Sequence, residues 1–234
     1  MNFACIIPAR GGSKGIPQKN IINIAGKPLV AWSIEQAIAS KYLQNKVYVT
    51  SDSDEILEIS GRFGAKTIKR PDEISRDSST SESALIHAFN EIQRKEGVID
   101  LIVFLQATSP LREATDIDNA IETLIDKNYD SLFSATELHD FFIWSNDEQG
   151  NLFSVNYDYR NRKRRQDIKV QYVENGSIYV FKPDILLRNN NRLGGRIGVS
   201  LMDSWKVHEV DNLENIELCE FYLANRILKK GKMI

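Results

Sequence analysis

Short apolar segments that alternate with amphipathic segments of helix length constrain the fold of this chain more than any other feature. The segment Leu101–Leu105 (LIVFL) is apolar at every position, which is typical of a central strand with both faces covered. Residues 114–127 instead place their apolar side chains on one face of a helix. Strands that alternate with such helices indicate βαβ units. We therefore expect an α/β fold with a mostly parallel central sheet flanked by helices.

The same two patterns recur along the chain and give a set of expected elements. Further strands are expected at residues 3–7, 46–50, 131–135, 177–181 and, in the segment WKVHEV, 205–210. Helices are expected after Pro28, after Ser53, and at 81–95 and 212–228. In open sheets of this kind, ligands bind beyond the carboxyl ends of the strands. The loops 6–20 and 106–112 both fall there, so we expect them to form one site.

The first expected strand runs into a glycine-rich basic loop, residues 6–20, which reads IIPARGGSKGIPQKN. Its glycines are Gly11, Gly12 and Gly15, and its cations include Arg10, Lys14 and Lys19. Glycine lets backbone N–H groups approach a bulky anion, and the cations suit phosphate oxygens. The spacing matches neither GxxxxGK[ST] nor GxGxxG, and a loop of this composition could be only a tight turn. The density of like charges favours a triphosphate site.

The composition is that of one globular domain, which we assign to residues 1–234, with 42% apolar and 26% charged residues. Thirty basic and 32 acidic residues give a net charge of −2, which argues against nucleic-acid and membrane-surface partners. Cys5 and Cys219 lie in apolar surroundings, as reduced thiols do. No signal peptide precedes the first strand, and no apolar run approaches membrane-spanning length. We therefore expect a cytoplasmic protein.

Residues 136–176 interrupt the alternation of strands and helices. This segment shows no helical period and contains many aromatic residues, followed by a basic run. The aromatic residues are Phe141, Phe142, Trp144, Phe153, Tyr157 and Tyr159, and the cations are Arg160, Arg162, Lys163, Arg164 and Arg165. Such a composition suits a protein interface, with a solvated surface insertion as the alternative.

Five segments in a fixed order give the chain a family resemblance. They are PARGGSKGIPQKNI (8–21), RPDEISRD (70–77), LQATSPLR (105–112), RRQD with NGSIY (164–179) and HEVDNLENIE (208–217). Together they resemble the motifs of the acylneuraminate cytidylyltransferases, the CMP-sialic acid synthetases, over nearly the whole chain. The resemblance implies a Rossmann-like nucleotidyltransferase fold.

The resemblance also implies a nucleotide site for CTP. Its residues would be Ala9, Arg10, Gly11, Gly12, Ser13, Lys14, Lys19, Asn20, Arg70, Ser81 and Ala107, and those with catalytic roles would be Arg10, Lys14, Lys19 and Asp211. The residues alone leave two of these open, because Arg70 could equally be a surface charge and Ser81 could simply cap a helix.

For the acceptor, Gln106 stands out because a polar amide directly after a buried strand lies where ligands bind. A nonulosonic acid carries a carboxylate, which an arginine binds with two parallel hydrogen bonds. The resemblance gives this role to Arg165, with Gln166 and Tyr179 as neighbours. It also implies that the segment 136–176 forms a dimerisation subdomain and that the partner chain helps to close the sugar site.

A hard divalent cation suits a reaction that spreads negative charge over phosphates, and Mg²⁺ prefers carboxylate oxygens. Glu209 and Asp211 lie at the end of the expected strand 205–210 and would point to the same face at i, i+2 spacing, although acids at this spacing are commonly solvent-facing. The resemblance makes them the metal ligands, with Glu209 where the family usually has Asp. A second departure is His139-Asp140-Phe141-Phe142 in place of an HPYK-like segment, which leaves the identity of the sugar open.

We therefore expect a nucleotidyltransferase that transfers CMP from CTP to the anomeric hydroxyl of a nonulosonic acid and releases pyrophosphate. The sequence does not identify a general base. Rival interpretations keep the fold and change the substrates, as in a CMP-legionaminate synthetase, a CMP-Kdo synthetase or a sugar-1-phosphate nucleotidyltransferase. A rival of a different class is a non-catalytic regulator that binds a nucleotide.

Overall fold

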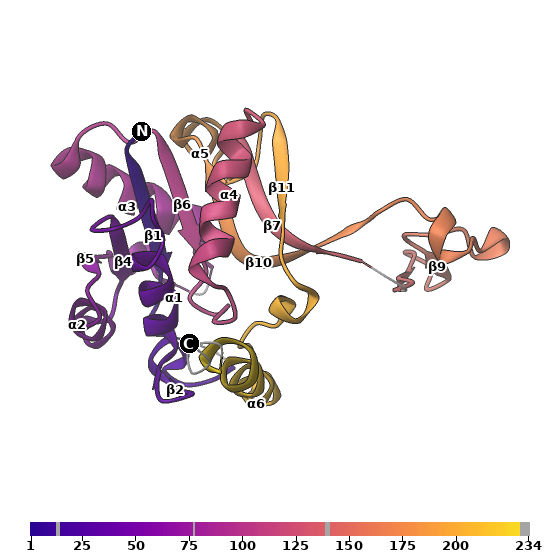
Figure 1. Ribbon diagram of the computed structural model, residues 1–234, viewed down its shortest axis with the longest axis horizontal. Coiled ribbons are helices and arrows are strands. Elements are labelled where there is room, and N and C mark those ends of the chain that lie inside the picture. Colours follow the sequence, from indigo (N-terminus) through magenta and orange to yellow (C-terminus); the bar gives the residue numbers. More distant parts are fainter. Residues whose placement is uncertain (13–14, 77, 139–140, 230–234) are drawn as a thin grey trace.

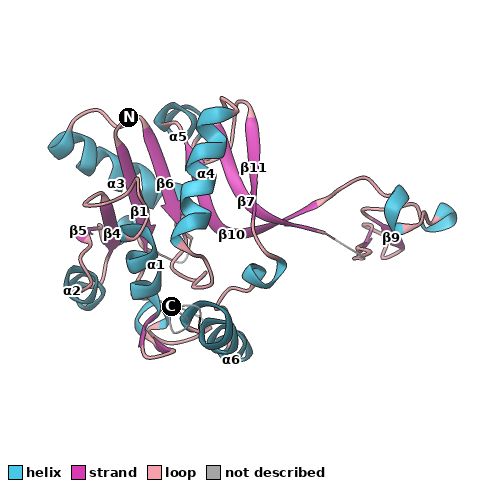
Figure 2. Ribbon diagram, viewed as in Figure 1, coloured by secondary structure: helices cyan, strands magenta, loops and turns pink. Residues whose placement is uncertain are grey.

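A seven-stranded sheet forms the centre of the protein in a computed structural model that describes residues 1–12, 15–76, 78–138 and 141–229, apart from the side chain of Arg165 (Figures 1 and 2). Along the sheet the strands are β11 (Ile197–Leu201), β7 (Ser131–Glu137), β10 (Tyr172–Phe181), β6 (Leu101–Leu105), β1 (Phe3–Pro8), β4 (Val47–Ser51) and β5 (Lys66–Lys69). β1, β4, β5 and β6 are parallel, β11 is parallel to β7, and β10 runs antiparallel between β6 and β7. The expected mostly parallel sheet is confirmed.

Helices cover both faces of the sheet. α1 (Leu29–Ile38), α2 (Asp54–Arg62) and α4 (Ala114–Asp126) pack on one face, and α3 (Ser81–Glu96) and α5 (Pro183–Asn189) pack on the other. Every residue of β6 is buried, because Val103 faces the first helix layer and Phe104 the second. This two-sided burial explains why LIVFL has no polar alternation.

Several elements have a weak sequence signal, among them β5, β11 and α5. β5 and β11 are edge strands, and α5 is a helix of under two turns that starts at Pro183. In β5 only Ile68 is buried, so the strand has neither an apolar run nor a regular alternation. Edge strands bury less apolar surface than central ones, which leaves them a weaker pattern.

The C-terminal part differs from the expectation in two places. The segment WKVHEV is not a strand, because Ser204–Val207 forms a 3₁₀ turn and an irregular segment follows it. The expected helix 212–228 is divided into α6 (Leu213–Tyr222), capped by Asn212, and a π-helical segment, Leu223–Leu228. α6 packs with the first loop and α1 in a third apolar cluster that includes Ile16, Trp32 and Cys219.

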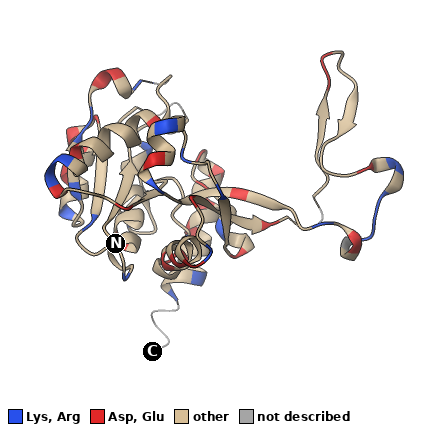
Figure 3. Cartoon of the chain, turned by 90° about the horizontal axis from the view of Figure 1, so that it is seen from above, with Lys and Arg blue, Asp and Glu red and all other residues tan. Residues whose placement is uncertain are grey.

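The segment 136–176 leaves the body of the protein as a long projection (Figures 1 and 3). β7 and β10 pair as far as Glu137 and Tyr172, so the sheet continues into its base. Beyond lie the hairpin β8 (Trp144–Asn146) and β9 (Leu152–Ser154) and the 3₁₀ turns Tyr159–Asn161 and Arg165–Asp167. A smaller hairpin, β2 (Asn23–Ile24) and β3 (Lys27–Pro28), lies at the base of α1. None of the helices that the structure describes combines the length and the hydrophobicity that a membrane-spanning segment needs.

Candidate active site

Most residues of the expected nucleotide site line one cavity of about 290 Å³ at the carboxyl ends of β1 and β6. The expected residues among its walls are Arg10, Gly12, Lys19, Asn20, Arg70, Ser81, Gln106 and Ala107. Ala9 and Gly11 belong to the same loop, whereas Ser13 and Lys14 lie outside the described residues. The fold therefore brings the loops after β1, β5 and β6 to one place, as expected of a single site.

The first loop is fixed by hydrogen bonds to its own backbone. Gly11 N donates to Asp52 Oδ1 at 2.9 Å, and Asn20 Nδ2 donates to the Arg10 carbonyl at 2.9 Å. A Cβ added at Gly12 would meet no atom of the described residues within 4 Å. Packing in the described structure therefore does not require glycine at position 12, and the space around its backbone is open to a ligand.

Arg70 is buried, with only 5% of its surface exposed, so the surface-charge alternative is wrong. Its Nε donates to Ser75 Oγ at 3.0 Å, and its Nη2 lies 3.5 Å from Asp52 Oδ1. Burial lowers the pKa of Arg70, and the charge of Asp52 opposes this shift. Nη2 makes no hydrogen bond to any described residue. Arg70 therefore offers the cavity a buried donor that suits a phosphate or carbonyl oxygen.

The helix-cap alternative for Ser81 is also wrong, because Thr80 is the cap. Ser83 N donates to Thr80 Oγ1 at 3.2 Å, and Ser81 is the first residue of α3. Thr80 and Ser81 both line the cavity, so the N-terminus of a 16-residue helix faces it. The partial positive charge at a helix N-terminus favours an anion there.

Glu209 and Asp211 reach the first loop from the irregular segment that follows the 3₁₀ turn. Lys19 Nζ lies 3.0 Å from Asp211 Oδ1. Thr108 Oγ1 donates to Glu209 Oε2 at 3.2 Å, and Val210 N donates to the Thr108 carbonyl at 2.8 Å. The pKa of Glu209 is raised, mainly by burial and then by the charge of Asp211. The charge of Asp211 therefore disfavours the charged form of Glu209, which a bound cation would relieve.

These two carboxylates fit a magnesium ion that shares its coordination shell with substrate. Mg²⁺ usually takes one or two carboxylates and completes its shell with waters and phosphate oxygens. Among the described residues, no group of three or more His, Cys, Asp or Glu side chains is placed to hold a metal. Two carboxylates are thus a donor set that Mg²⁺ accepts from a protein, but too few for a cage built by the described residues alone.

Gln106 contacts a bulge of β10, a relationship that the sequence analysis missed. Gln106 Nε2 donates to the Gly176 carbonyl at 2.6 Å. Gly176 has φ of +63°, and a Cβ there would lie 2.1 Å from Glu209 Oε1 and 2.4 Å from Gln106 Nε2. Only glycine fits, because both the backbone conformation and the space exclude a side chain. The NGSIY motif held the signal, as a glycine inside an otherwise regular strand marks a bulge.

Tyr179 is only 3% exposed and lies behind the cavity wall rather than in it. Its ring stacks on Phe104, which lines the cavity, with centroids 5.2 Å apart. Its hydroxyl donates to Glu174, and burial is the main cause that raises the pKa of Tyr179. The guanidinium of Arg192, a residue that the sequence analysis did not select, lies over both rings and 3.1 Å from Glu82.

The remaining acceptor residues lie on the projection, apart from Gln106 and Tyr179. Gln166 lines a separate cavity of about 420 Å³ between Phe142, Tyr157 and Val170. Arg165 belongs to the 3₁₀ turn Arg165–Asp167, and its side chain is outside the description. His139 and Asp140, where the family motif departs, are also outside it. Within one chain, the structure does not make Tyr179 a neighbour of Arg165.

A mostly parallel sheet whose carboxyl edge joins a glycine-rich cationic loop to a pair of acids is the arrangement expected of a nucleotidyltransferase. The sequence profile of the family described as "Cytidylyltransferase" matches residues 4–231. The chain belongs to this family.

Named relatives agree with this assignment. The chain is 38% identical to N-acylneuraminate cytidylyltransferase A of Danio rerio, across 79% of this chain and 42% of that protein. It is 32% identical to pseudaminic acid cytidylyltransferase of Campylobacter jejuni strain 81-176, across 94% of this chain and 95% of that protein. It thus spans about two fifths of the length of the Danio relative.

A solved structure shares the fold. It is a CMP:2-keto-3-deoxy-manno-octonic acid synthetase complexed with CTP, with a TM-score of 0.71 and 16% sequence identity, across 97% of this chain and all of that chain. This likeness shows a common fold.

Proposed function

We propose that this protein transfers CMP from CTP to the anomeric hydroxyl of a nonulosonic acid. The observation that carries the proposal is the cavity lined by the cationic first loop, whose wall residues Lys19 and Thr108 contact Asp211 and Glu209. The names of the Danio and Campylobacter relatives, both cytidylyltransferases of nonulosonic acids, support the choice of donor and acceptor.

The reaction is a single displacement at phosphorus. The anomeric oxygen forms a bond to the α-phosphorus of CTP, the bond from that phosphorus to the bridging oxygen of the β-phosphate breaks, and pyrophosphate leaves. The hydroxyl proton passes to solvent or to a base that the described residues do not identify. No covalent enzyme intermediate is needed, so catalysis rests on positioning and charge neutralisation.

Residues of the chain supply most of that positioning. Arg10, Lys19 and Arg70 would bind phosphate oxygens, and the start of α3 would add its helix dipole. Glu209 and Asp211 would hold Mg²⁺, which when bound would offset the charge that develops on the leaving pyrophosphate. Gln106 would contact the sugar.

A homodimer would complete the sugar site. The projection exposes large apolar side chains, among them Phe141, Trp144, Leu152, Phe153, Val155 and Tyr159, which one isolated chain would leave in water. A second copy bound there by a two-fold axis would bury the same patch on both chains. Arg165 of one copy could then serve the sugar carboxylate at the site of the other, which accounts for its separation from Gln106 within one chain.

The location that fits this function is the cytoplasm. Both cysteines are buried thiols, Cys5 in the sheet and Cys219 in α6. Buried reduced thiols are usual in a reducing compartment.

The two alternatives for the acceptor, a sialic-type acid and a pseudaminic-type acid, correspond to the two kinds of named relative.

The test is a pyrophosphate-release assay with CTP, Mg²⁺ and a panel of N-acetylneuraminic, legionaminic, pseudaminic and Kdo acids. We expect turnover with at least one nine-carbon acid, and far less with ATP, GTP or UTP as donor. Turnover only with Kdo would mean that the acceptor is not a nonulosonic acid. Tight CTP binding by calorimetry without turnover on any acid would favour the non-catalytic regulator.

A further inference from the structure

Arg112, in the loop after β6, is completely buried, and its hydrogen bonds to the described residues go to neutral groups. Nε donates to Ser177 Oγ at 3.0 Å, Nη1 to Ser33 Oγ at 2.7 Å, and Nη2 to the Gln106 carbonyl at 2.5 Å. Burial lowers the pKa of Arg112 to about 10. A buried cation bonded only to neutral acceptors is costly, and an apolar side chain of similar size is often no less stable in such a place. The position therefore needs a reason beyond packing.

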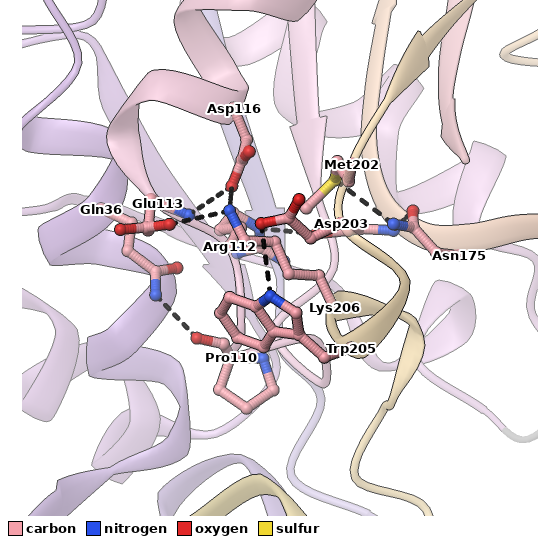
Figure 4. Close-up of polar contacts among 11 residues, drawn as sticks. Gln36, Pro110, Arg112, Glu113, Asp116, Asn175, Met202, Asp203, Trp205 and Lys206 are labelled. Carbon is pink, nitrogen blue, oxygen red and sulfur yellow. Dashed lines mark hydrogen bonds and ion pairs between the residues drawn. The ribbon is translucent and has the colours of Figure 1, made fainter. Parts of the chain in front are cut away.

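The carboxylates that follow Arg112 in the sequence are bound to another cation. Glu113 and Asp116 accept from Lys206 Nζ at 2.8 Å and 2.6 Å (Figure 4). Lys206 is itself buried, with 3% of its side chain exposed. Lys206 thus ties the C-terminal segment to the start of α4, while the fork of Arg112 serves a different purpose.

Arg112 bridges the two segments that hold Gly176. Gln106 directly follows β6, on the β6 side of the bulge, and Ser177 directly follows Gly176 in β10. Asn175 fixes the bulge from the other side, since its Oδ1 accepts from Ser134 Oγ at 2.6 Å and from Ser177 N at 3.2 Å. Together with the hydrogen bond from Gln106 N to the Ser177 carbonyl at 3.4 Å, the guanidinium therefore holds the separation between the Gln106 backbone and the Gly176 carbonyl.

This separation fixes the direction of the Gln106 amide. Its Nε2 must face the Gly176 carbonyl, because only the nitrogen can donate. Its Oε1 is then left as a hydrogen-bond acceptor beside the cavity that Gln106 lines. An acceptor in that place would select a hydroxyl or an amide N–H of the sugar.

We propose that Arg112 is a positioning residue for the acceptor sugar, which it serves by holding Gln106 with its amide oxygen toward the substrate. The inference rests on the proposed function, because it needs a sugar at Gln106. It assigns Arg112 no contact with substrate. The three neutral bonds of the guanidinium, one to each of α1, β10 and the Gln106 backbone, are what carry it.

The test is a double-mutant cycle on KM for the sugar. Arg112→Lys keeps the charge and loses the planar fork, so it should raise this KM by about tenfold and leave KM for CTP within about twofold. In a Gln106→Ala background, Arg112→Lys should change the sugar KM by less than about twofold, because a residue that acts through Gln106 has nothing left to position. Effects that multiply in the double variant would overturn the proposal.

Two further variants keep the test decisive if Arg112→Lys folds poorly. Ser177→Ala removes one acceptor of the guanidinium and keeps Arg112. Like Arg112→Lys, it should raise the sugar KM when Gln106 is present and leave this KM nearly unchanged in the Gln106→Ala background. Ser60→Ala is the matched control, since it removes a buried hydroxyl that bonds only within α2, to the Ile56 carbonyl. We expect it to lower the melting temperature without changing either KM. Wild type inactive on every nonulosonic acid would overturn the proposed function together with this role, whereas an active wild type with multiplying effects would overturn only the role of Arg112.

Discussion

Lys19 Nζ lies 3.0 Å from Asp211 Oδ1, an ion pair between residues 192 positions apart in the sequence. The first loop and the last loop meet at this pair, and a Cβ on Gly15 would lie 2.9 Å from the Asp211 carbonyl oxygen. The Lys19 side chain is 17% exposed and that of Asp211 67%. A cation and an anion of the expected site thus hold each other beside the cavity, where a triphosphate and its metal would each compete for one of them.

Removing the cation should weaken use of CTP. Lys19→Ala should lower kcat/KM for CTP by about ten- to a hundred-fold, because water replaces a charge-assisted bond to phosphate poorly. Lys41→Ala is the control, since Lys41 pairs with Glu122 on the helix layer and should leave the kinetics unchanged. Steady-state kinetics with CTP varied measure the effect. Equal kinetics for Lys19→Ala and Lys41→Ala would remove Lys19 from the phosphate site.

Removing a carboxylate should weaken Mg²⁺ binding directly. Asp211→Asn keeps the shape and loses the charge, so both Mn²⁺ binding measured by electron paramagnetic resonance and turnover should fall, by about ten- to a hundred-fold in affinity. Glu209→Gln should lose less, and Glu209→Asp should be tolerated. Asp184→Asn, an exposed carboxylate on α5 that pairs with Arg188, should bind Mn²⁺ like wild type. Unchanged Mn²⁺ affinity in Asp211→Asn would place the metal elsewhere.

The half-buried position of Glu209 also predicts how the stability of the metal-free protein depends on pH. The pKa of Glu209 is raised in the folded protein. Its contribution to the free energy of unfolding is therefore fully present below its unfolded pKa of about 4.3 and is lost as pH rises through the folded pKa. Glu209→Gln should therefore melt higher than metal-free wild type at pH 7, and the difference should shrink below pH 4. Thermal melts across this range measure it. A constant difference at every pH would contradict the assignment.

Substitution by alanine should affect stability at one glycine of the site and not at another. Gly176→Ala should lower stability by about 1–3 kcal/mol and also damage the sugar KM, because the new Cβ is strained and displaces Gln106 and Glu209. Gly12→Ala should leave the melting temperature nearly unchanged, since its Cβ would meet no described atom within 4 Å, and should raise KM for CTP. Melting curves and kinetics of the two variants form a matched pair. A destabilised Gly12→Ala would mean that protein packing occupies the space around it.

A shared site can be tested by mixing two inactive variants. Arg165→Ala and Asp211→Asn would each nearly inactivate both sites of their own homodimer. After unfolding and refolding together, half of the dimers should carry one copy of each, and one of their two sites would be intact, so about a quarter of wild-type activity should return. Sites completed within one chain would return none. Sedimentation of the wild type as a monomer at micromolar concentration would contradict the dimer itself.

The sequence determined the elements whose burial leaves a periodic pattern. Leu101–Leu105 had to be a central strand because no face of it tolerates water, and α4 had to be a helix because its apolar residues recur at helical spacing. The same logic brought the first loop and Gln106 to one edge of the sheet, since parallel strands end together. The edge strands β5 and β11 give only a weak signal in the sequence, because burial at the edge of a sheet is too slight to impose a hydrophobic pattern.

Only the tertiary structure decided which polar residues are buried together. The sequence leaves the burial of Arg112 and Arg70 open, whereas the structure encloses one wholly and the other nearly so. Gly176 meets Gln106 and Glu209 from positions 70 and 33 residues away, and no local rule relates them. Hydrogen bonds across strands depend on how the chain returns to the sheet, whereas periodicity depends only on near neighbours. That difference explains why the scaffold of the site could be predicted and the network that orients it could not.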